Sequence, residues 1–349
     1  MKNFSKNIPM RKDNLKFIDL FAGIGGIRIA FERAGAKCVW ASEWDEASQD
    51  MYEANFGHRP AGDITKISSA EIPNHDILTG GFPCQTFSII GDRQGFADTR
   101  GTLFFEVERI LKDKQPYAFL LENVKQLTTH DNGLTFKVIL DHLQKLDYFV
   151  HWKVLNALNY GWPQKRERVL IVGFKRNHPF EFPNGHLKTP IATLTDLLEP
   201  DNKVDKKHFI SDRVAKKLRE KVKNKKVFYP SIWHENKAGN IGIHPFSCAL
   251  RANASYNYLL VNGKRRPTPR ENLRLMGFPD SFKIVVNDSQ VRKQAGNSVI
   301  VPKIESVAKA IVEAIKKPPI KPAREAVQTS IFAPMESSQS TKEIYAKYR

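Results

Sequence analysis

The sequence predicts an α/β protein in which a sheet carries helices on both faces and is followed by a smaller, irregular second domain. Short apolar runs alternate with amphipathic helical patterns through the first half of the chain. This alternation stops after Phe174, where a stretch rich in Pro, Asn and Lys begins. Late in the chain, over 299–315, apolar positions return to helical spacing. With 349 residues, 41% of them hydrophobic, the chain can bury one large core or two unequal ones.

The predicted strands are short apolar runs, each joined to the next by a segment of helical or loop character. A repeated strand–helix–strand order predicts a parallel sheet, because each crossover helix returns the chain to the same edge. The strands are expected at 17–21, 38–42, 76–80, 118–123, 149–157 and 168–174, with helices beginning near Gly25 and Glu46 and others near 102–113 and 133–146.

The composition favours a polyanionic partner and an intracellular location. A net charge of +18 indicates nucleic acid, although a basic surface kept for solubility would give the same number. Eleven Lys or Arg against three acids fall within 203–226, either as a phosphate-contacting face or as a solvated one. The three cysteines are too few and too scattered for a disulfide framework or a zinc site. Because no signal peptide or membrane span is evident, we expect a cytoplasmic protein.

A glycine loop follows the first predicted strand. Gly23, Gly25 and Gly26 lie where the backbone must turn tightly and approach a ligand. A dinucleotide fingerprint would need another glycine at Arg28, which argues against a nicotinamide or flavin site. Glu43 comes twenty residues after Gly23 and could accept hydrogen bonds from ribose hydroxyls, with the neighbouring Trp44 against an adenine ring. Taken alone, the loop could equally be a structural turn.

Two further chemical groups follow predicted strands at the same edge of the sheet. Cys84 lies in GGFPCQ after the strand at 76–80, where open α/β sheets bind ligands, and a thiolate there would be a nucleophile. Cys38 and Cys248 are expected to be inert. Glu122 ends the strand at 118–123, where partial burial would let a carboxyl keep a proton near neutral pH. A capping or salt-bridging glutamate is the alternative.

These motifs, in this order, resemble the DNA cytosine-5 methyltransferases of bacterial restriction–modification systems. The resemblance covers roughly 17–176 and 265–315. It rests on nine segments in family order, namely DLFAGIGG (19–26), SEWD (42–45), GDI (62–64), GGFPCQTFS (80–88), DTRGTLFF (98–105), LENV (121–124), QKRERV (164–169), TPRENLRLMGFP (268–279) and QAGNSV (294–299). It implies a Rossmann-like S-adenosylmethionine-dependent methyltransferase sheet with a target-recognition domain.

The resemblance also assigns site residues. Cys84 would attack C6 of cytosine, Glu122 would contact N3, Arg168 would contact the carbonyl oxygen of the base, and Arg166 would support them. No metal is implied. The expected S-adenosylmethionine site comprises Phe21, Gly23, Gly25, Gly26, Glu43, Trp44, Asp63, Ile64, Pro83, Leu103, Asn297 and Ser298.

The implied substrate is double-stranded DNA, from which the target base must be flipped out. The stretch 85–101 fits a loop that closes over that base, with an ordinary surface loop as the alternative. Base reading is expected among side chains in 228–265, near Trp233, His234, Arg251 or Asn253. The DNA contacts that the resemblance and the charges suggest are Gln85, Ser88, Arg93, Arg100 and Arg251.

The same resemblance gives expectations for organisation and partners. The catalytic domain is expected to be discontinuous, over 14–176 and 290–317, with target recognition in 177–289 and loose termini at 1–13 and 318–349. A monomer associated with the bacterial nucleoid, with a cognate restriction endonuclease as functional partner, is implied. A tRNA cytosine-5 methyltransferase and a non-catalytic DNA-binding relative are the rival interpretations.

Overall fold

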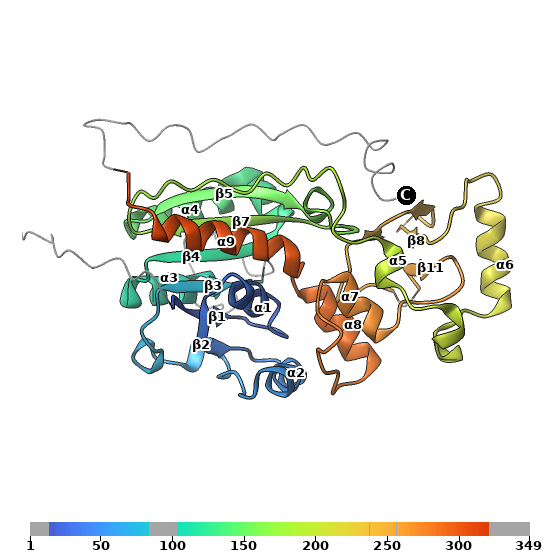
Figure 1. Cartoon of the computed structure of the whole chain (residues 1–349), viewed down its shortest axis with the longest axis horizontal. Coiled ribbons are helices and arrows are strands. Elements are labelled where there is room, and N and C mark those ends of the chain that lie inside the picture. Colours follow the sequence, from blue (N-terminus) through green and yellow to red (C-terminus); the bar gives the residue numbers. More distant parts are fainter. Residues whose placement is uncertain (1–13, 84–102, 237, 256, 321–349) are drawn as a thin grey trace, which may run out of the picture.

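The computed structural model describes residues 14–83, 103–236, 238–255 and 257–320, and its centre is a six-stranded sheet (Figure 1). Each predicted strand is present, with bounds within two residues of those expected. Along the sheet the order is β2-β1-β3-β4-β7-β5. The strands are β1 (Lys16–Leu20), β2 (Lys37–Ser42), β3 (Ile77–Gly80), β4 (Ala118–Val124), β5 (Phe149–Asn156) and β7 (Glu167–Phe174).

The sheet is mixed, and the expectation of a parallel sheet is wrong for β7. Strands β1 to β4 pair in parallel, whereas β7 runs antiparallel to both of its neighbours, β4 and β5. The connection from β5 to β7 explains this direction. It contains only a 3-10 turn (Ala157–Tyr160) and the two-residue strand β6 (Gln164–Lys165). A parallel return needs a crossover of a dozen or more residues, usually a helix, so the chain turns back instead.

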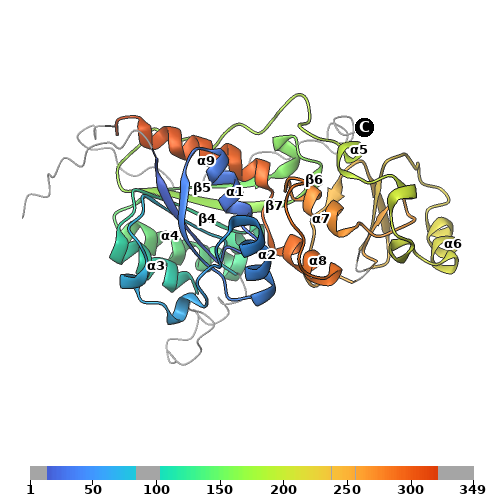
Figure 2. The ribbon, with the colours of Figure 1, turned by 60° about the horizontal axis from the view of Figure 1, so that its bottom comes forward.

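Helices cover both faces of the sheet. On one face α1 (Gly26–Arg33) packs against α9 (Val301–Lys316), and on the other lie α3 (Leu103–Lys114) and α4 (Leu134–Lys145) (Figures 1 and 2). Successive residues of β1 alternate between two cores, with Phe17 in the first and Ile18 in the second. Helix α2 (Glu46–Phe56) follows β2.

Residues between the sheet and α7 build a separate, smaller arrangement at one side of the molecule (Figure 1). A three-stranded antiparallel sheet, β8 (Ile232–Glu235), β9 (Ile241–His244) and β11 (Leu259–Val261), shares a core with α6 (Asp212–Lys221). The one-turn helix α5 (Leu194–Leu197) precedes it, and β10 (Ser247–Cys248) pairs with β6. The proposed domain boundaries stay a prediction.

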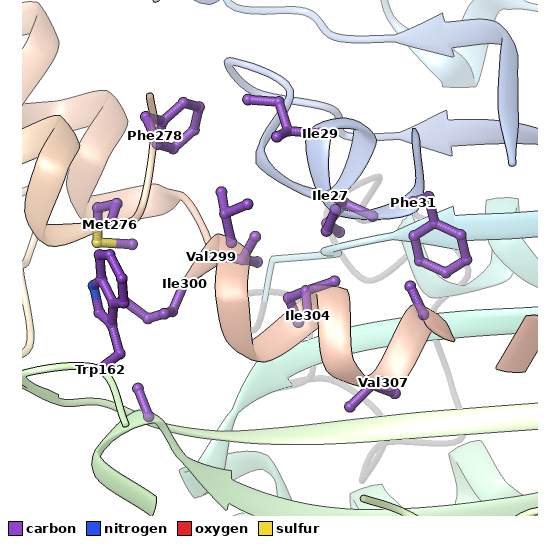
Figure 3. Close-up of a cluster of buried hydrophobic side chains, with 14 of the residues drawn as sticks. Ile27, Ile29, Phe31, Trp162, Met276, Phe278, Val299, Ile300, Ile304 and Val307 are labelled. Carbon is purple, nitrogen blue, oxygen red and sulfur yellow. The ribbon is translucent and has the colours of Figure 1, made fainter. Parts of the chain in front are cut away.

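The late helix, which the apolar spacing predicts, packs on the main sheet, as the resemblance implies. Helices α7 (Pro269–Leu275) and α8 (Asp288–Asn297) lead into α9. Figure 3 shows Ile304 and Val307 of α9 on the side of Ile27 and Phe31 of α1, while Trp162 and Met276 lie together beside Ile300, where α9 begins. The Trp162 indole N–H also donates to the Leu275 carbonyl at 2.8 Å. Within the described residues, none of the helices has the length and apolar character of a membrane span.

A buried ion pair fixes the start of α7. The Arg265 guanidinium makes two 2.8 Å contacts with the Glu271 carboxylate, and both side chains are fully buried. Arg265 Nε donates to Asp201 at 2.8 Å, and Nη2 donates to the Glu199 carbonyl. Glu271 also accepts the Thr268 backbone N–H, which completes a capping box. The segment before the recognition sheet is thereby tied to the segment after it.

Candidate active site

Glu122 and Arg168 form an ion pair at one end of the strands of the main sheet, where β4 ends and β7 begins. Strands β4 and β7 run antiparallel with Val124 opposite Arg168, which brings the two side chains together. Arg168 Nε lies 3.0 Å from Glu122 Oε1, and both side chains are largely buried. The pair can hold a planar polar group by accepting from it and donating to it.

The segment that leads into Cys84 is hydrogen-bonded to the same end of β4. Asn123 Nδ2 donates to the Phe82 carbonyl at 2.8 Å, and Asn123 Oδ1 accepts the Val124 N–H. A Cβ added at Gly81 would stand 3.5 Å from Glu122 Oε2, so this backbone passes directly beside the carboxylate. Asn123 was not singled out from the sequence, although a second polar residue at a strand end was the available signal. Pro83 is exposed.

Several predicted site residues lie outside the described ranges. They are Cys84, Gln85, Ser88, Arg93 and Arg100, together with the expected loop at 85–101, the terminus at 1–13 and most of the one at 318–349. Their assigned roles stay predictions.

Arg166, two residues before Arg168, donates hydrogen bonds to backbone carbonyl groups. Its guanidinium donates to the carbonyls of Leu250 and Gly296, each at 2.9 Å, and of Ser298 at 2.5 Å. The residue is 1% exposed, and burial lowers the pKa of its guanidinium to about 9. These contacts join the β6–β7 connection to the end of α8, which suits the supporting role that the resemblance implies.

The glycine loop is held by Glu43. One carboxylate oxygen accepts the Gly23 N–H at 2.8 Å and the other accepts the Asp45 N–H at 2.9 Å. Burial raises the pKa of Glu43, while these backbone donors act in the opposite direction. Each carboxylate oxygen can accept a further hydrogen bond, so Glu43 could still receive a ligand hydroxyl.

The surface above the loop is open. A Cβ at Gly23, where φ is +54°, would meet nothing within 4 Å, and Trp44, which follows Glu43 in the chain, is 78% exposed. Phe21 and Gly25 also have positive φ, at 55° and 84°, so the loop turns sharply at three places. An exposed indole next to an open glycine loop is available to cover an aromatic ligand.

The end of α8 meets the start of α1. A Cβ at Gly26 would lie 2.7 Å from Ser298 Oγ, so any side chain here would force the Ser298 side chain to move. Asn297 is exposed at this point, and Lys293 of α8 pairs with Asp45 at 2.7 Å. The structure therefore brings Ser298, far along the chain, to the predicted cofactor loop.

Three other residues predicted to line the cofactor site lie outside the glycine loop, namely Asp63, Ile64 and Leu103. The Asp63 carboxylate caps the 3-10 turn Ile64–Lys66 by accepting from Thr65 N–H and Oγ–H at 3.0 and 2.8 Å. Ile64 is buried in the core against which the half-buried Leu103 packs. The Asp63 carboxylate is thus engaged locally, whereas Ile64 and Leu103 contribute apolar surface.

Asp19 is a buried acid that the sequence reasoning missed. It stands in β1 immediately before the glycine loop, fully buried, and accepts the Thr79 hydroxyl at 2.8 Å. Burial raises the pKa of its carboxyl to about 7. An aspartate inside an apolar strand was the signal that could have identified it.

Asp19→Asn is expected to raise the thermal unfolding temperature more at pH 8.5 than at pH 5. The folded state binds this proton more tightly than the unfolded state, so wild-type stability falls as pH rises from the ordinary value of 3.8 towards 7. Asparagine carries no charge and escapes that loss. Thermal unfolding at both pH values measures the difference. The exposed Asp50→Asn serves as control, and an equal change at both pH values for Asp19→Asn would contradict the prediction.

In the recognition region, the structure separates core residues from accessible ones. Trp233 is 6% exposed, packs against Gly263 and donates to Ser231 Oγ at 3.2 Å, so its ring is part of the small core. The Arg251 guanidinium lies over the Tyr258 ring, 4.9 Å from Cζ to the ring centroid. The basic side chains of α6 are exposed on its outer face.

The remaining cysteines match the expectation of inert thiols. Burial raises the pKa of both Cys38 and Cys248 to about 11, so neither forms thiolate readily at neutral pH. Among the described residues, no group of His, Cys, Asp and Glu side chains is arranged to hold a metal ion.

Comparison with known proteins identifies the family. The model of the C-5 cytosine-specific DNA methylases matches residues 15–313. The chain belongs to this family. It is a DNA (cytosine-5)-methyltransferase.

Individual relatives of this methylase agree. The Type II methyltransferase M.HaeII of Haemophilus aegyptius is 58% identical over 86% of this chain and 93% of its own length. M.NgoBI of Neisseria gonorrhoeae is 57% identical over 84% and 92%. Among solved structures, the Entamoeba histolytica methyltransferase EhMeth superposes with a TM-score of 0.69, over 87% of this chain and all of its own, at 18% identity. That last likeness concerns the fold.

Proposed function

We propose that this methylase transfers a methyl group from S-adenosylmethionine to C5 of a flipped-out cytosine within a specific short duplex sequence, and so protects host DNA from a cognate endonuclease. The observation that carries the proposal is the Glu122–Arg168 pair beside the backbone that leads into Cys84. The Type II relatives support the restriction–modification context.

The cofactor site proposed is the open surface of the glycine loop. Glu43 would accept from the ribose hydroxyls, and Trp44 would cover the adenine. Phe21, Ile64, Pro83 and Leu103 would supply apolar contact, and Asn297 and Ser298 would close the site from the end of α8. The fit rests on the space above Gly23, the exposed indole and the remaining acceptor capacity of Glu43. When bound, S-adenosylmethionine supplies an electrophilic methyl group on a sulfonium.

The protein's task is to make C5 of cytosine nucleophilic. The Cys84 thiolate adds to C6 and forms a C–S bond, and the electron pair of the C5–C6 double bond moves into the ring. Glu122 donates a proton or hydrogen bond to N3, which neutralises the charge that develops there. Arg168 donates to the base carbonyl oxygen and holds the ring in place. After C5 has accepted the methyl group, loss of the C5 proton restores the double bond and expels Cys84 as thiolate.

The substrate must reach these groups outside the double helix. Unpairing one base costs a few kcal/mol, which contacts elsewhere must offset. The net charge of +18, and the exposed Lys and Arg of α6, provide phosphate contacts for that purpose. We place sequence recognition in 177–289, with Arg251 at its border with the catalytic residues.

Expression in a host that lacks cytosine methylation tests the proposal directly. Bisulfite sequencing of the host DNA is expected to show 5-methylcytosine at one position of one short sequence, and a tritium-transfer assay with purified protein should label duplex DNA. Label on tRNA alone would support the rival RNA activity. No label on either nucleic acid would contradict the proposal.

A further inference from the structure

Helix α2 is hydrogen-bonded at both of its ends to the late segment of the chain that contains α8. At its first end, Lys293 Nζ of α8 donates to Asp45 Oδ1 at 2.7 Å, and Asp45 is the N-cap residue of α2. At its last turn, Asn55 accepts the Lys283 N–H at 2.7 Å and donates to the Lys283 carbonyl at 3.0 Å. Segments that are distant in sequence therefore lie side by side along α2 (Figures 1 and 2).

The contact at Asp45 continues to the predicted cofactor residues. The Asp45 N–H donates to one oxygen of Glu43 at 2.9 Å, and the other Glu43 oxygen accepts the Gly23 N–H at 2.8 Å. Asp45 Oδ2 accepts the N–H and the hydroxyl of Ser48 at 3.0 and 2.8 Å. The Asp45 side chain is thus held from α2 on one side and from Lys293 on the other, and its backbone N–H orients the Glu43 carboxylate.

We propose that Lys293 is a positioning residue for the S-adenosylmethionine site, which holds the segment 43–45 in the orientation that receives the adenosine. This inference rests on the proposed function, in which Glu43 accepts from the ribose and Trp44 covers the adenine. A ligand binds more weakly to a segment that it must first order, because ordering costs conformational entropy. The ion pair with Asp45 orders this segment before the cofactor binds.

Lys293→Met tests the proposal through binding of S-adenosylhomocysteine, the product that remains after methyl transfer. Isothermal titration calorimetry measures this binding without any reaction. The dissociation constant is expected to rise about two- to fivefold, which corresponds to the loss of a partly exposed ion pair. The KM for S-adenosylmethionine should rise by the same factor, while the KM for DNA keeps its wild-type value. Lys293→Arg, which can still donate to Asp45, should restore the affinity.

Ionic strength provides a second readout, which a purely structural role of Lys293 would not change. Salt screens the attraction between partly exposed charges. The affinity of wild type for S-adenosylhomocysteine should therefore fall as salt is added, and that of Lys293→Met should change less, so that the two proteins become alike at high salt. An equal salt response of both proteins would contradict the proposal.

Asn55→Ala is the matched control. It removes both hydrogen bonds to Lys283 from the far end of the same helix and leaves the contacts of Asp45 in place. It is expected to lower the thermal unfolding temperature without changing the affinity for S-adenosylhomocysteine. Unchanged affinity in Lys293→Met would overturn the proposal, and so would equal weakening by Asn55→Ala, because any loosening of α2 would then have the same effect. Failure of wild type itself to bind S-adenosylhomocysteine would instead reject the proposed cofactor site.

Discussion

Cys84→Ala is expected to abolish methyl transfer, and Glu122→Gln to slow it by about 10²–10⁴-fold, the usual range for loss of a general acid. Without the thiol no addition at C6 occurs, so C5 stays a poor nucleophile. Glutamine keeps the shape of Glu122 but cannot give up a proton to N3, and it also loses the ion pair with Arg168. Single-turnover assays with labelled S-adenosylmethionine measure both losses.

Covalent trapping tests directly whether Cys84 is the nucleophile. In DNA with 5-fluorocytosine at the target, the final step fails because fluorine cannot leave C5 as a proton does. Wild type should remain attached to such DNA through a denaturing gel, whereas Cys84→Ala should not. Cys248→Ala is the control, since burial keeps that thiol protonated. Trapping of Cys84→Ala at the wild-type level would show that another group is the nucleophile.

Arg265→Met is expected to lower the free energy of unfolding by about 3–5 kcal/mol, the range found when one partner of a buried ion pair is removed. The change leaves Glu271 buried with no cation beside it, and it deprives Asp201 and the Glu199 carbonyl of donors. Urea unfolding followed by circular dichroism measures the loss.

Arg274→Met provides the comparison for that prediction. Arg274 also pairs with an acid, Asp280, at 2.7 Å, but the Asp280 side chain is 65% exposed. Solvent-exposed pairs contribute only about 0–1 kcal/mol. Similar losses for Arg265→Met and Arg274→Met would mean that burial of the Arg265–Glu271 pair does not determine its importance.

The fold could be predicted from the sequence as far as local patterns determine it. Apolar runs located the strands of the main sheet, and spacing located α9. The direction of β7 could not be predicted by assuming a repeated unit, because it depends on the short connection after β5. The burial of Trp233 in the small core with α6 likewise could not be predicted from local patterns, because it depends on contacts between distant segments.

The site could be predicted only through its motifs. The sequence placed Cys84 and Glu122 at neighbouring strand ends, but the ion pair between Glu122 and Arg168 depends on antiparallel register across two strands. Asp19 was overlooked because it occupies a position where the apolar pattern predicts a core residue. The raised pKa of its carboxyl depends on burial, which requires the tertiary structure.

The position of α9 affects how the protein is made. Phe174 is the last residue of the main sheet along the chain. Helix α9, which covers α1 and its neighbouring strands, ends at Lys316, roughly 140 residues later. At about 5–20 residues per second, a ribosome needs on the order of 10–30 s to supply it. Throughout that interval the nascent chain exposes the apolar surface of Ile27 and Phe31, which makes this stage of synthesis the one at which a chaperone would bind.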